Sequence, residues 1–236
     1  MKTKFLIIGL ALAMLVLAGC VQSNSTDNTI NAAGNSELTL KPDQAEVAAG
    51  VSILRTNAKD AQDEASRINN AIIAALKEKG LSESEIQTES VNLYEDKSWE
   101  NNQMVSNGWR ATQTLKAKTK DLTKVGSIVD AFVTGGANQI DYINFGLSNE
   151  KEQEYKMKAL ADATANAKAK AETIAASLGI KLGKIKTVSE SNYYYNPYRY
   201  DMINVKAVPA AISEAAQVLP KDVTVTASIN LVYSIK

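Results

Sequence analysis

Several stretches of the chain alternate apolar and polar residues, a period-two pattern that predicts half-buried β-strands. The clearest one covers residues 223–235, where an apolar residue fills every second position. A second strong one covers residues 46–56, with four apolar residues on one side. Weaker versions predict further strands at residues 38–40, 86–94, 109–118, 139–147 and 184–191.

Three other stretches repeat apolar residues every three or four positions, the spacing of a helix with one buried face. They predict helices at about residues 58–79, from Asp121 to Gly135, and at about residues 150–178. The predicted capping residues are Asn57 and Gly80, Asp121 and Gly136, and Asn149 with Glu152 and Gly179. In the longest helix, the predicted buried stripe is Leu160, Ala163, Ala167, Ala171, Ile174 and Leu178.

Hairpin-forming strands mixed with covering helices predict an α+β fold, with a mainly antiparallel sheet and about three helices packed on one face. The polar link 95–108 predicts a hairpin with a mobile tip between two of the strands. A weak repeat relates residues 47–90 to residues 139–191, which indicates either duplicated strand-helix-strand units or a chance similarity.

The N-terminus carries the pattern of an export signal. Lys2 and Lys4 precede an apolar segment of roughly 14 residues, which is too short to span a bilayer. The segment ends at Leu17-Ala18-Gly19-Cys20, which looks like the lipobox of exported prokaryotic lipoproteins, where the cysteine thiol is acylated and the chain is cut before it. The alternatives are an uncleaved anchor or an unrelated cysteine after an ordinary signal. We expect a signal peptide at 1–19, lipidated Cys20 with a flexible tether through residue 36, and one folded domain at 37–236.

The amino-acid composition excludes several kinds of catalytic and metal-binding site in this domain. The chain has no histidine and one cysteine, which excludes Ser-His-Asp and Cys-His triads and every site that needs His or several Cys ligands. We therefore expect no catalytic residues, no metal site and no cofactor. Removing Lys2 and Lys4 from 26 basic residues leaves 24 against 26 acidic ones, a net charge near −2 that does not fit a nucleic-acid partner.

A tyrosine-rich run is the main candidate for an interaction surface. Residues 193–200 hold five of the nine tyrosines. Tyrosine loses little entropy when it is fixed, so a loop of this kind suits recognition of an envelope protein or a glycan, or assembly into a homo-oligomer. The alternative is a loop whose rings pack on the sheet edge and only stabilise the fold. The weak repeat predicts that Trp99 lies at the same end of the domain. The candidate surface is Tyr193, Tyr194, Tyr195, Tyr198, Arg199, Tyr200 and Trp99.

Scattered short motifs resemble one family in order and spacing. They include Lys41-Pro42-Asp43-Gln44-Ala45, Ala58-Lys59-Asp60-Ala61, Ile86-Gln87-Thr88, Gly108-Trp109-Arg110-Ala111, Gly136-Ala137-Asn138, Ile143-Asn144-Phe145 and Lys168-Ala169-Lys170-Ala171-Glu172. The chain resembles the SIMPL-domain family of exported bacterial and archaeal proteins over about residues 37–236. Trp109 stands where Tyr is commoner, and the tyrosine-rich run is not a general family feature. The resemblance implies periplasmic or surface α+β proteins that tend to oligomerise, some linked to stress tolerance, with no established catalytic residues.

We therefore expect a non-catalytic scaffold or binding module that is anchored by lipid to the outer face of the cell membrane, or held in the periplasm or outer membrane. Its expected partners are the membrane, a second copy of the chain, and an envelope protein or glycan. One alternative is a carboxylate-dependent surface hydrolase, which needs two convergent carboxyl groups in a cleft. Another is a small-ligand-binding lipoprotein that serves a transporter, which needs a deep apolar pocket.

Overall fold

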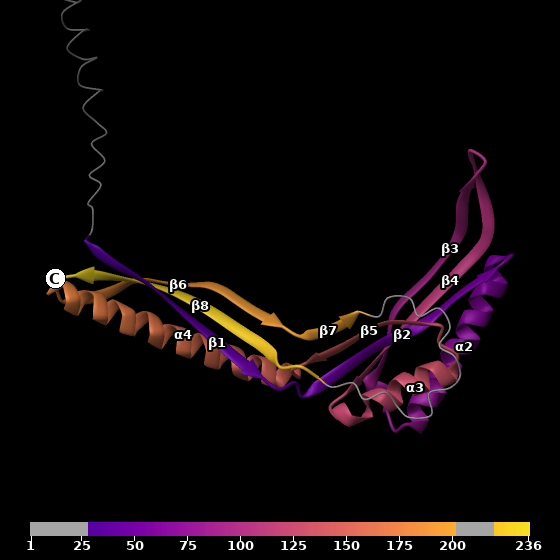
Figure 1. Ribbon diagram of the computed structural model, residues 1–236, viewed down its shortest axis with the longest axis horizontal. Coiled ribbons are helices and arrows are strands. Elements are labelled where there is room, and N and C mark those ends of the chain that lie inside the picture. The colour runs from indigo at the N-terminus through magenta and orange to yellow at the C-terminus, as the bar shows by residue number, and fades with distance from the viewer. Residues whose placement is uncertain (1–27, 202–219) are drawn as a thin grey trace, which may run out of the picture.

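The chain bends near its middle into two lobes, each made of an antiparallel sheet with helices on one face (Figure 1). The computed structural model describes residues 28–201 and 220–236, and within them three α-helices and eight strands. The helices lie on the outer side of the bend, and the open faces of the sheets line its inner side. This arrangement confirms the predicted α+β class, although two sheets stand where we expected one.

One lobe is a three-stranded sheet covered by a single long helix. Its strands lie in the order β1 (Thr29–Leu40), β8 (Val223–Ile235) and β6 (Leu182–Asn196). The helix is α4 (Asn149–Leu178), which packs mainly on β1 and β8. The central strand β8 buries every second side chain from Val223 to Tyr233 against α4, as the sequence predicted.

Helix α4 lies unusually close to its sheet because only alanines separate the two. A row of alanines spaced four residues apart is buried, namely Ala159, Ala163, Ala167, Ala171 and Ala175. A Cβ atom on Gly34 of β1 would lie 2.0 Å from the carbonyl oxygen of Ala163 and 2.4 Å from the backbone nitrogen of Ala167. The predicted buried stripe of this helix is confirmed at Ala163, Ala167 and Ala171. It was wrong at Ile174 and Leu178, which are 39% and 65% exposed, because this spacing leaves no room for a larger side chain.

Strand β1 begins well before the predicted start of the folded domain. We assigned residues 29–36 to a flexible tether, but they pair with β8 from Thr29↔Ser234 onward. Lys170 of α4 donates to the Ala33 carbonyl at 2.9 Å, and Asn166 donates to the Asn35 carbonyl at 3.2 Å. The helix therefore supplies donors for carbonyls of β1, the strand at the edge of this sheet.

The other lobe is a five-stranded sheet covered by two helices. Its strand order is β3 (Ile86–Glu100), β4 (Gln103–Thr119), β2 (Gln44–Arg55), β5 (Gln139–Gly146) and β7 (Tyr198–Asp201). The helices are α2 (Ala58–Glu78) and α3 (Val125–Gly135), and the short 3₁₀ helices η1 (Glu83–Glu85) and η2 (Leu122–Lys124) precede β3 and α3. The fully buried Ile72, Leu76, Phe132 and Phe145 belong to the core of this lobe.

The predicted ends of α2 and the predicted C-terminal end of α3 are confirmed, whereas the predicted start of α3 is not. The Asn57 side chain accepts from the Asp60 backbone nitrogen at the start of α2. Gly80 and Gly136 have φ of 86° and 103°, the left-handed conformation that ends a helix and favours glycine. Asp121 caps η2 instead of the helix itself, since α3 begins at Val125.

The hairpin predicted across the polar link 95–108 is present, but most of the link is paired strand rather than a loop. Strands β3 and β4 run through it to a two-residue turn at Asn101 and Asn102, whose φ values of 46° and 63° suit a hairpin turn with the twist of the strands. Ion pairs and side-chain hydrogen bonds along the arm explain its polarity: Arg110 with Asp96 at 2.5 Å, and Asn107 donating to Asp96 at 2.9 Å. The result is a hairpin arm, residues 91–111, whose tip projects from its lobe (Figure 1).

The two strand-helix-strand units of the weak repeat are both present but are used differently. Helix α2 connects β2 to β3 within one sheet. Helix α4 connects β5 of the five-stranded sheet to β6 of the three-stranded sheet. The second unit therefore carries the chain from one lobe to the other.

The close contact between α4 and β1 is tested by Ala167→Leu. The larger side chain has no space beside Gly34, so we expect the free energy of unfolding to fall by about 3 kcal/mol. Ala169→Leu is the matched control, because Ala169 is exposed on the same helix and should change stability by no more than about 0.5 kcal/mol. Urea denaturation followed by circular dichroism measures both. Equal effects of the two substitutions would contradict the close packing.

Candidate functional site

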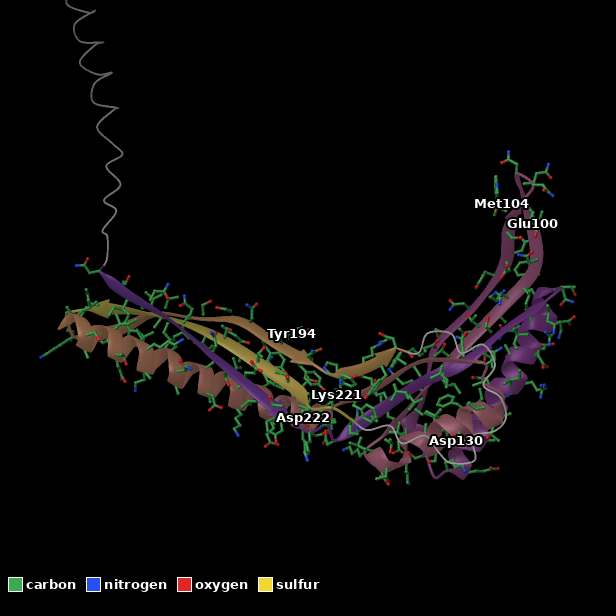
Figure 2. The ribbon with its side chains drawn as sticks, viewed as in Figure 1. Glu100, Met104, Asp130, Tyr194, Lys221 and Asp222 are labelled. Atoms are coloured by element: carbon green, nitrogen blue, oxygen red, sulfur yellow. The ribbon has the colours of Figure 1, made fainter. Side chains whose placement is uncertain are left out.

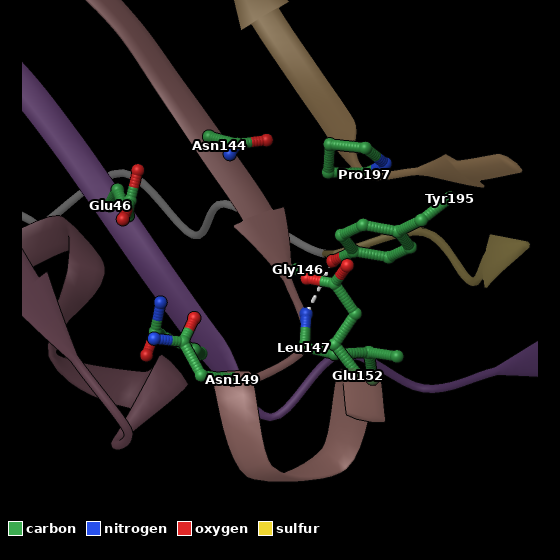
Figure 3. Close-up of a pocket in the computed structure, with 9 residues that line it drawn as sticks. Glu46, Asn144, Gly146, Leu147, Asn149, Glu152, Tyr195 and Pro197 are labelled. Carbon is green, nitrogen blue, oxygen red and sulfur yellow. Dashed lines mark hydrogen bonds between the residues drawn. The ribbon is translucent and has the colours of Figure 1, made fainter. Parts of the chain in front are cut away.

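The two lobes meet at a joint where three described connections cross from one sheet to the other. Residues 41–43 lead from β1 to β2, residues 147 and 148 lead from β5 to α4, and Pro197 separates β6 from β7. Asp43 and Ser148 contact each other across two of these crossings. Residues in and beside the crossings line a cavity (Figure 3). We treat this joint as the candidate site.

Asp43 holds two of the crossings together. Its carboxylate accepts from the Ser148 backbone nitrogen at 2.7 Å and from the Ser148 hydroxyl at 2.9 Å, and it lies 3.5 Å from the Lys151 ammonium. Its own backbone nitrogen donates to the Gly146 carbonyl at 3.0 Å. Burial alone would raise the pKa of the Asp43 carboxyl, but the hydrogen bonds from Ser148 and the charge of Lys151 outweigh it, so this pKa is lowered.

Asp43 also accepts a hydrogen bond at the start of α4, where we predicted a capping box formed by Asn149 and Glu152. The N-cap residue of α4 is Ser148, one residue before the predicted cap Asn149. The Ser148 side chain makes no capping hydrogen bond of its own. Instead, the carboxylate from a distant segment satisfies the Ser148 backbone donor at the positive end of the helix. In the sequence, Asp43 stands out only as part of a short motif. Its contact with Ser148 leaves no local signal, because the two residues lie 105 positions apart.

The tyrosine-rich run is strand, not loop. Residues 193–196 continue β6 and pair with residues 224–227 of β8, and residues 198–201 form β7 on the edge of the other sheet. Exposure alternates along the run, with Tyr193 and Tyr195 partly buried and Tyr194 62% exposed. The run therefore spans both sheets and contributes one strand to each.

Tyr195 fastens this run to the crossing at the start of α4. Its hydroxyl accepts from the Leu147 backbone nitrogen at 2.5 Å (Figure 3). A Cβ on Gly146 would lie 2.5 Å from that hydroxyl oxygen, so glycine makes the approach possible. Burial raises the pKa of Tyr195, which keeps its phenol protonated at neutral pH.

Tyr193 contacts the first turns of α4. The Lys156 ammonium lies 4.6 Å from the centre of its ring, and its hydroxyl donates to a Glu152 carboxylate oxygen at 3.4 Å. Burial, with the nearby Glu152 charge, raises the pKa of Tyr193 to about 12. The phenol is thus a hydrogen-bond donor at physiological pH rather than a base.

The residues of β7 pack on the five-stranded sheet. Tyr198 and Tyr200 meet edge to face with ring centres 4.5 Å apart, and Tyr200 also meets Phe145 edge to face at 6.1 Å. Arg199 turns to the other side, where its guanidinium lies 3.9 Å from the centre of the Tyr142 ring. Four of the five candidate tyrosines are therefore partly buried. Tyr195 contacts the crossing at Leu147 and Tyr198 packs against both cores, which favours the stabilising alternative for most of the run.

Trp99 lies apart from these tyrosines. It is 66% exposed beside the tip of the hairpin arm, where Figure 2 places Met104 and Glu100, whereas Tyr194 lies near the middle of the molecule. The prediction that Trp99 shares a surface with the tyrosine run was wrong, because the link that we took for a loop extends as two paired strands away from the body. Cys20 lies outside the described residues.

The cavity at the joint has a volume of about 150 Å³. It is lined by Gln44, Glu46, Asn144, Gly146, Leu147, Asn149, Glu152, Tyr195 and Pro197. Drug-sized ligands need pockets of about 300–1,000 Å³ with mainly apolar walls. This smaller and more polar cavity differs from the pocket expected of a small-ligand carrier.

The carboxylates of Glu46 and Glu152 line the cavity, and a hydrolase would require two such groups. Glu46, however, already forms an ion pair. Glu46 lies 3.0 Å from the Lys118 ammonium. Within residues 28–201 and 220–236, no group of three or more acidic or cysteine side chains is arranged to hold a metal ion. In the same described residues, no helix is both long and apolar enough to cross a membrane.

Asp43→Asn tests the contact that joins the crossings. A lowered folded-state pKa means that the ionised carboxylate stabilises the fold above its unfolded pKa of about 4, and that this contribution disappears as the pH falls through the folded pKa. We expect Asp43→Asn to lower the free energy of unfolding by about 2 kcal/mol at pH 7 and to flatten its decline between about pH 5 and pH 2.

Urea denaturation at a series of pH values measures this effect. Asp162→Asn is the control, because Asp162 is exposed on the same helix that Asp43 caps. If the Asp43→Asn protein lost stability with falling pH as steeply as the unmodified chain, the carboxylate would not have the assigned role.

Comparison with known proteins places both lobes in one family. The family model SIMPL, described as a protein of unknown function (DUF541), matches residues 30–233, from within β1 to within β8. The "26 kDa periplasmic immunogenic protein" of Brucella melitensis is 27% identical over 250 residues, which covers 99% of this chain and 98% of that protein. The "Uncharacterized protein YggE" of Escherichia coli is 26% identical over 215 residues, covering 89% and 86%. The chain belongs to the SIMPL family.

Proposed function

We propose that this protein is a non-catalytic module of the cell envelope, anchored by a lipid on Cys20 outside the cytoplasm, that works by binding a second copy of itself. The names of the Brucella relatives, which describe periplasmic proteins, support its export. The charged and apolar pattern of residues 1–19, followed by Cys20, supports the anchor. Two acyl chains on one residue would give the stable attachment that a single chain does not.

Cys20→Ser tests the anchor. Without the thiol no lipid can be attached, so we expect the protein to move from the membrane fraction to the soluble extracytoplasmic fraction. Mass spectrometry of the unmodified chain should find Cys20 as the N-terminal residue with a diacylglyceryl mass. Ser23→Ala, three residues later, should leave the protein on the membrane. A wild-type protein with a free Cys20 thiol would contradict the anchor.

The observation that carries the binding role is the uncovered strand β6. Val188 pairs with the buried Leu231, and Ile185 pairs with the buried Tyr233, so both side chains lie on the face of the sheet that α4 covers. Yet they are 61% and 51% exposed, because α4 packs mainly on β1 and β8. Within residues 28–201 and 220–236, α4 leaves these large apolar side chains largely exposed, and a strand of this kind is suited to a partner that covers them.

A second copy of the chain is the partner that we favour. β6 is an edge strand, so its outer backbone groups can pair with another strand. Two copies related by a two-fold axis would place β6 beside β6, and each would cover the exposed apolar residues of the other. Such self-association suits a scaffold, because it requires neither a cofactor nor a reactive side chain.

Val188→Lys tests the assembly, in the Cys20→Ser background so that the protein is free of lipid. We expect the background protein to sediment as a dimer and Val188→Lys to sediment as a monomer, because a buried ammonium in the interface is costly. Val133→Lys is the matched control, since Val133 is 48% exposed on α3 of the other lobe and should leave the dimer intact. A background protein that is monomeric at every concentration would overturn the proposal.

A further inference from the structure

The tip of the hairpin arm carries an exposed pair of apolar side chains. Trp99 of β3 and Met104 of β4 lie directly opposite each other, so they share one face of the hairpin. They are 66% and 58% exposed, and Val105 on the next position is 40% exposed. The turn between the strands consists of Asn101 and Asn102. The feature is a narrow apolar projection, not a groove that could receive another chain.

The charges of the arm are arranged to leave this tip nearly uncharged. Residues 98–107 contain a single ionisable side chain, Glu100. Farther from the tip, Lys97 pairs with Glu95 at 2.6 Å and Arg110 pairs with Asp96 at 2.5 Å. The polar groups around Trp99 and Met104 are otherwise amides and hydroxyls. This composition is typical of protein segments that lie at the water–lipid interface. There a tryptophan ring buries its apolar body and keeps its N–H near polar groups.

The position of the tip relative to the anchor points to the same surface. Strand β1 begins at the outer end of one lobe and the hairpin tip lies at the outer end of the other, and both are on the inner side of the bend, away from the helices (Figure 1). Eight residues lead from Cys20 to Asn28, and a fully extended chain covers about 3.5 Å per residue, so Asn28 lies within about 28 Å of the lipid anchor. The inner side of the bend can therefore face the membrane.

We propose that the tip of the hairpin arm, through Trp99 and Met104, inserts into the headgroup region of the membrane that carries the anchor. The protein then touches the bilayer at both ends, by acyl chains at one and by the hairpin at the other. The hairpin contact is weak by itself. It forms because the anchor holds the tip at a high effective concentration next to the lipid. The inference rests on the proposed lipid anchor.

The test attaches the protein to vesicles without relying on natural lipidation. Cys20 is the only cysteine, so the chain from Cys20 onward can be coupled to a maleimide-bearing lipid in phosphatidylcholine vesicles. Trp99 and Trp109 are the only tryptophans, so the difference between the unmodified chain and Trp99→Phe isolates the emission of Trp99. Trp109 is partly buried against the core and serves as an internal control.

We expect Trp99 emission to shift to shorter wavelengths on coupling and to be largely lost when the phosphatidylcholine is brominated. The remaining Trp109 emission in Trp99→Phe should respond to neither change. Trp99→Phe should keep the circular dichroism of the unmodified chain, since the side chain is exposed. Trp99 emission that ignores brominated lipid would overturn the inference. A shift that grows with protein density but not with bromination would also overturn it, because a second chain would then cover the tip.

The failure of this inference is distinct from the failure of the proposed function. Mass analysis of Cys20 in the natural protein decides whether the anchor exists, and sedimentation decides whether β6 mediates a dimer. The quenching experiment supplies its anchor chemically, so a negative result there concerns only the hairpin tip.

Discussion

The contact between Asp43 and Ser148 is the constraint on which the arrangement of the two lobes depends. Each lobe has its own core, and the three crossings at the joint, residues 41–43, 147–148 and 197, are short. A carboxylate on the first crossing that accepts two hydrogen bonds from the second fixes where β2 starts and where α4 starts. Tyr195, bonded to the adjacent Leu147 backbone, adds the β6 to β7 connection to the same cluster. Polar contacts at the crossings therefore hold the bend of the molecule, together with Tyr198, which packs against both cores.

Features that depend on neighbours in the sequence could be predicted from it. Asn57 and Gly80 bound α2, and the alternation of residues 223–235 identifies β8, because capping and side-chain periodicity are local properties. The start of β1 could not be found in the same way. Residues 29–36 are small or polar except for Ile30, and this composition suggested a tether. Their small side chains are instead what allows α4 to approach Gly34, a requirement that comes from a helix more than a hundred residues later.

The candidate site was hidden for two physical reasons. Tyrosine is amphipathic, so the alternation of buried Tyr193 and Tyr195 with exposed Tyr194 leaves no alternation of residue type in the sequence. The pairing of Asp43 with a residue 105 positions away leaves no local signal either. The tyrosine run and the exposed apolar character of Trp99 were predicted from the sequence. The location of Trp99 was not predicted, because the polar residues around it stabilise paired strands through cross-strand contacts such as Arg110 with Asp96.

The hydrogen bonds from Lys170 and Asn166 to the carbonyls of β1 affect how this sheet can extend by pairing with other chains. A sheet with two free edges can recruit chains at both sides and extend without limit, which is the geometry of a fibre. Within the described residues, two carbonyls of the β1 edge are engaged by its own helix, and β6 forms the other edge of this sheet. In the dimer that we propose, pairing through β6 would use this edge of each chain and leave the partly engaged β1 edges outermost, which would disfavour further growth along this sheet.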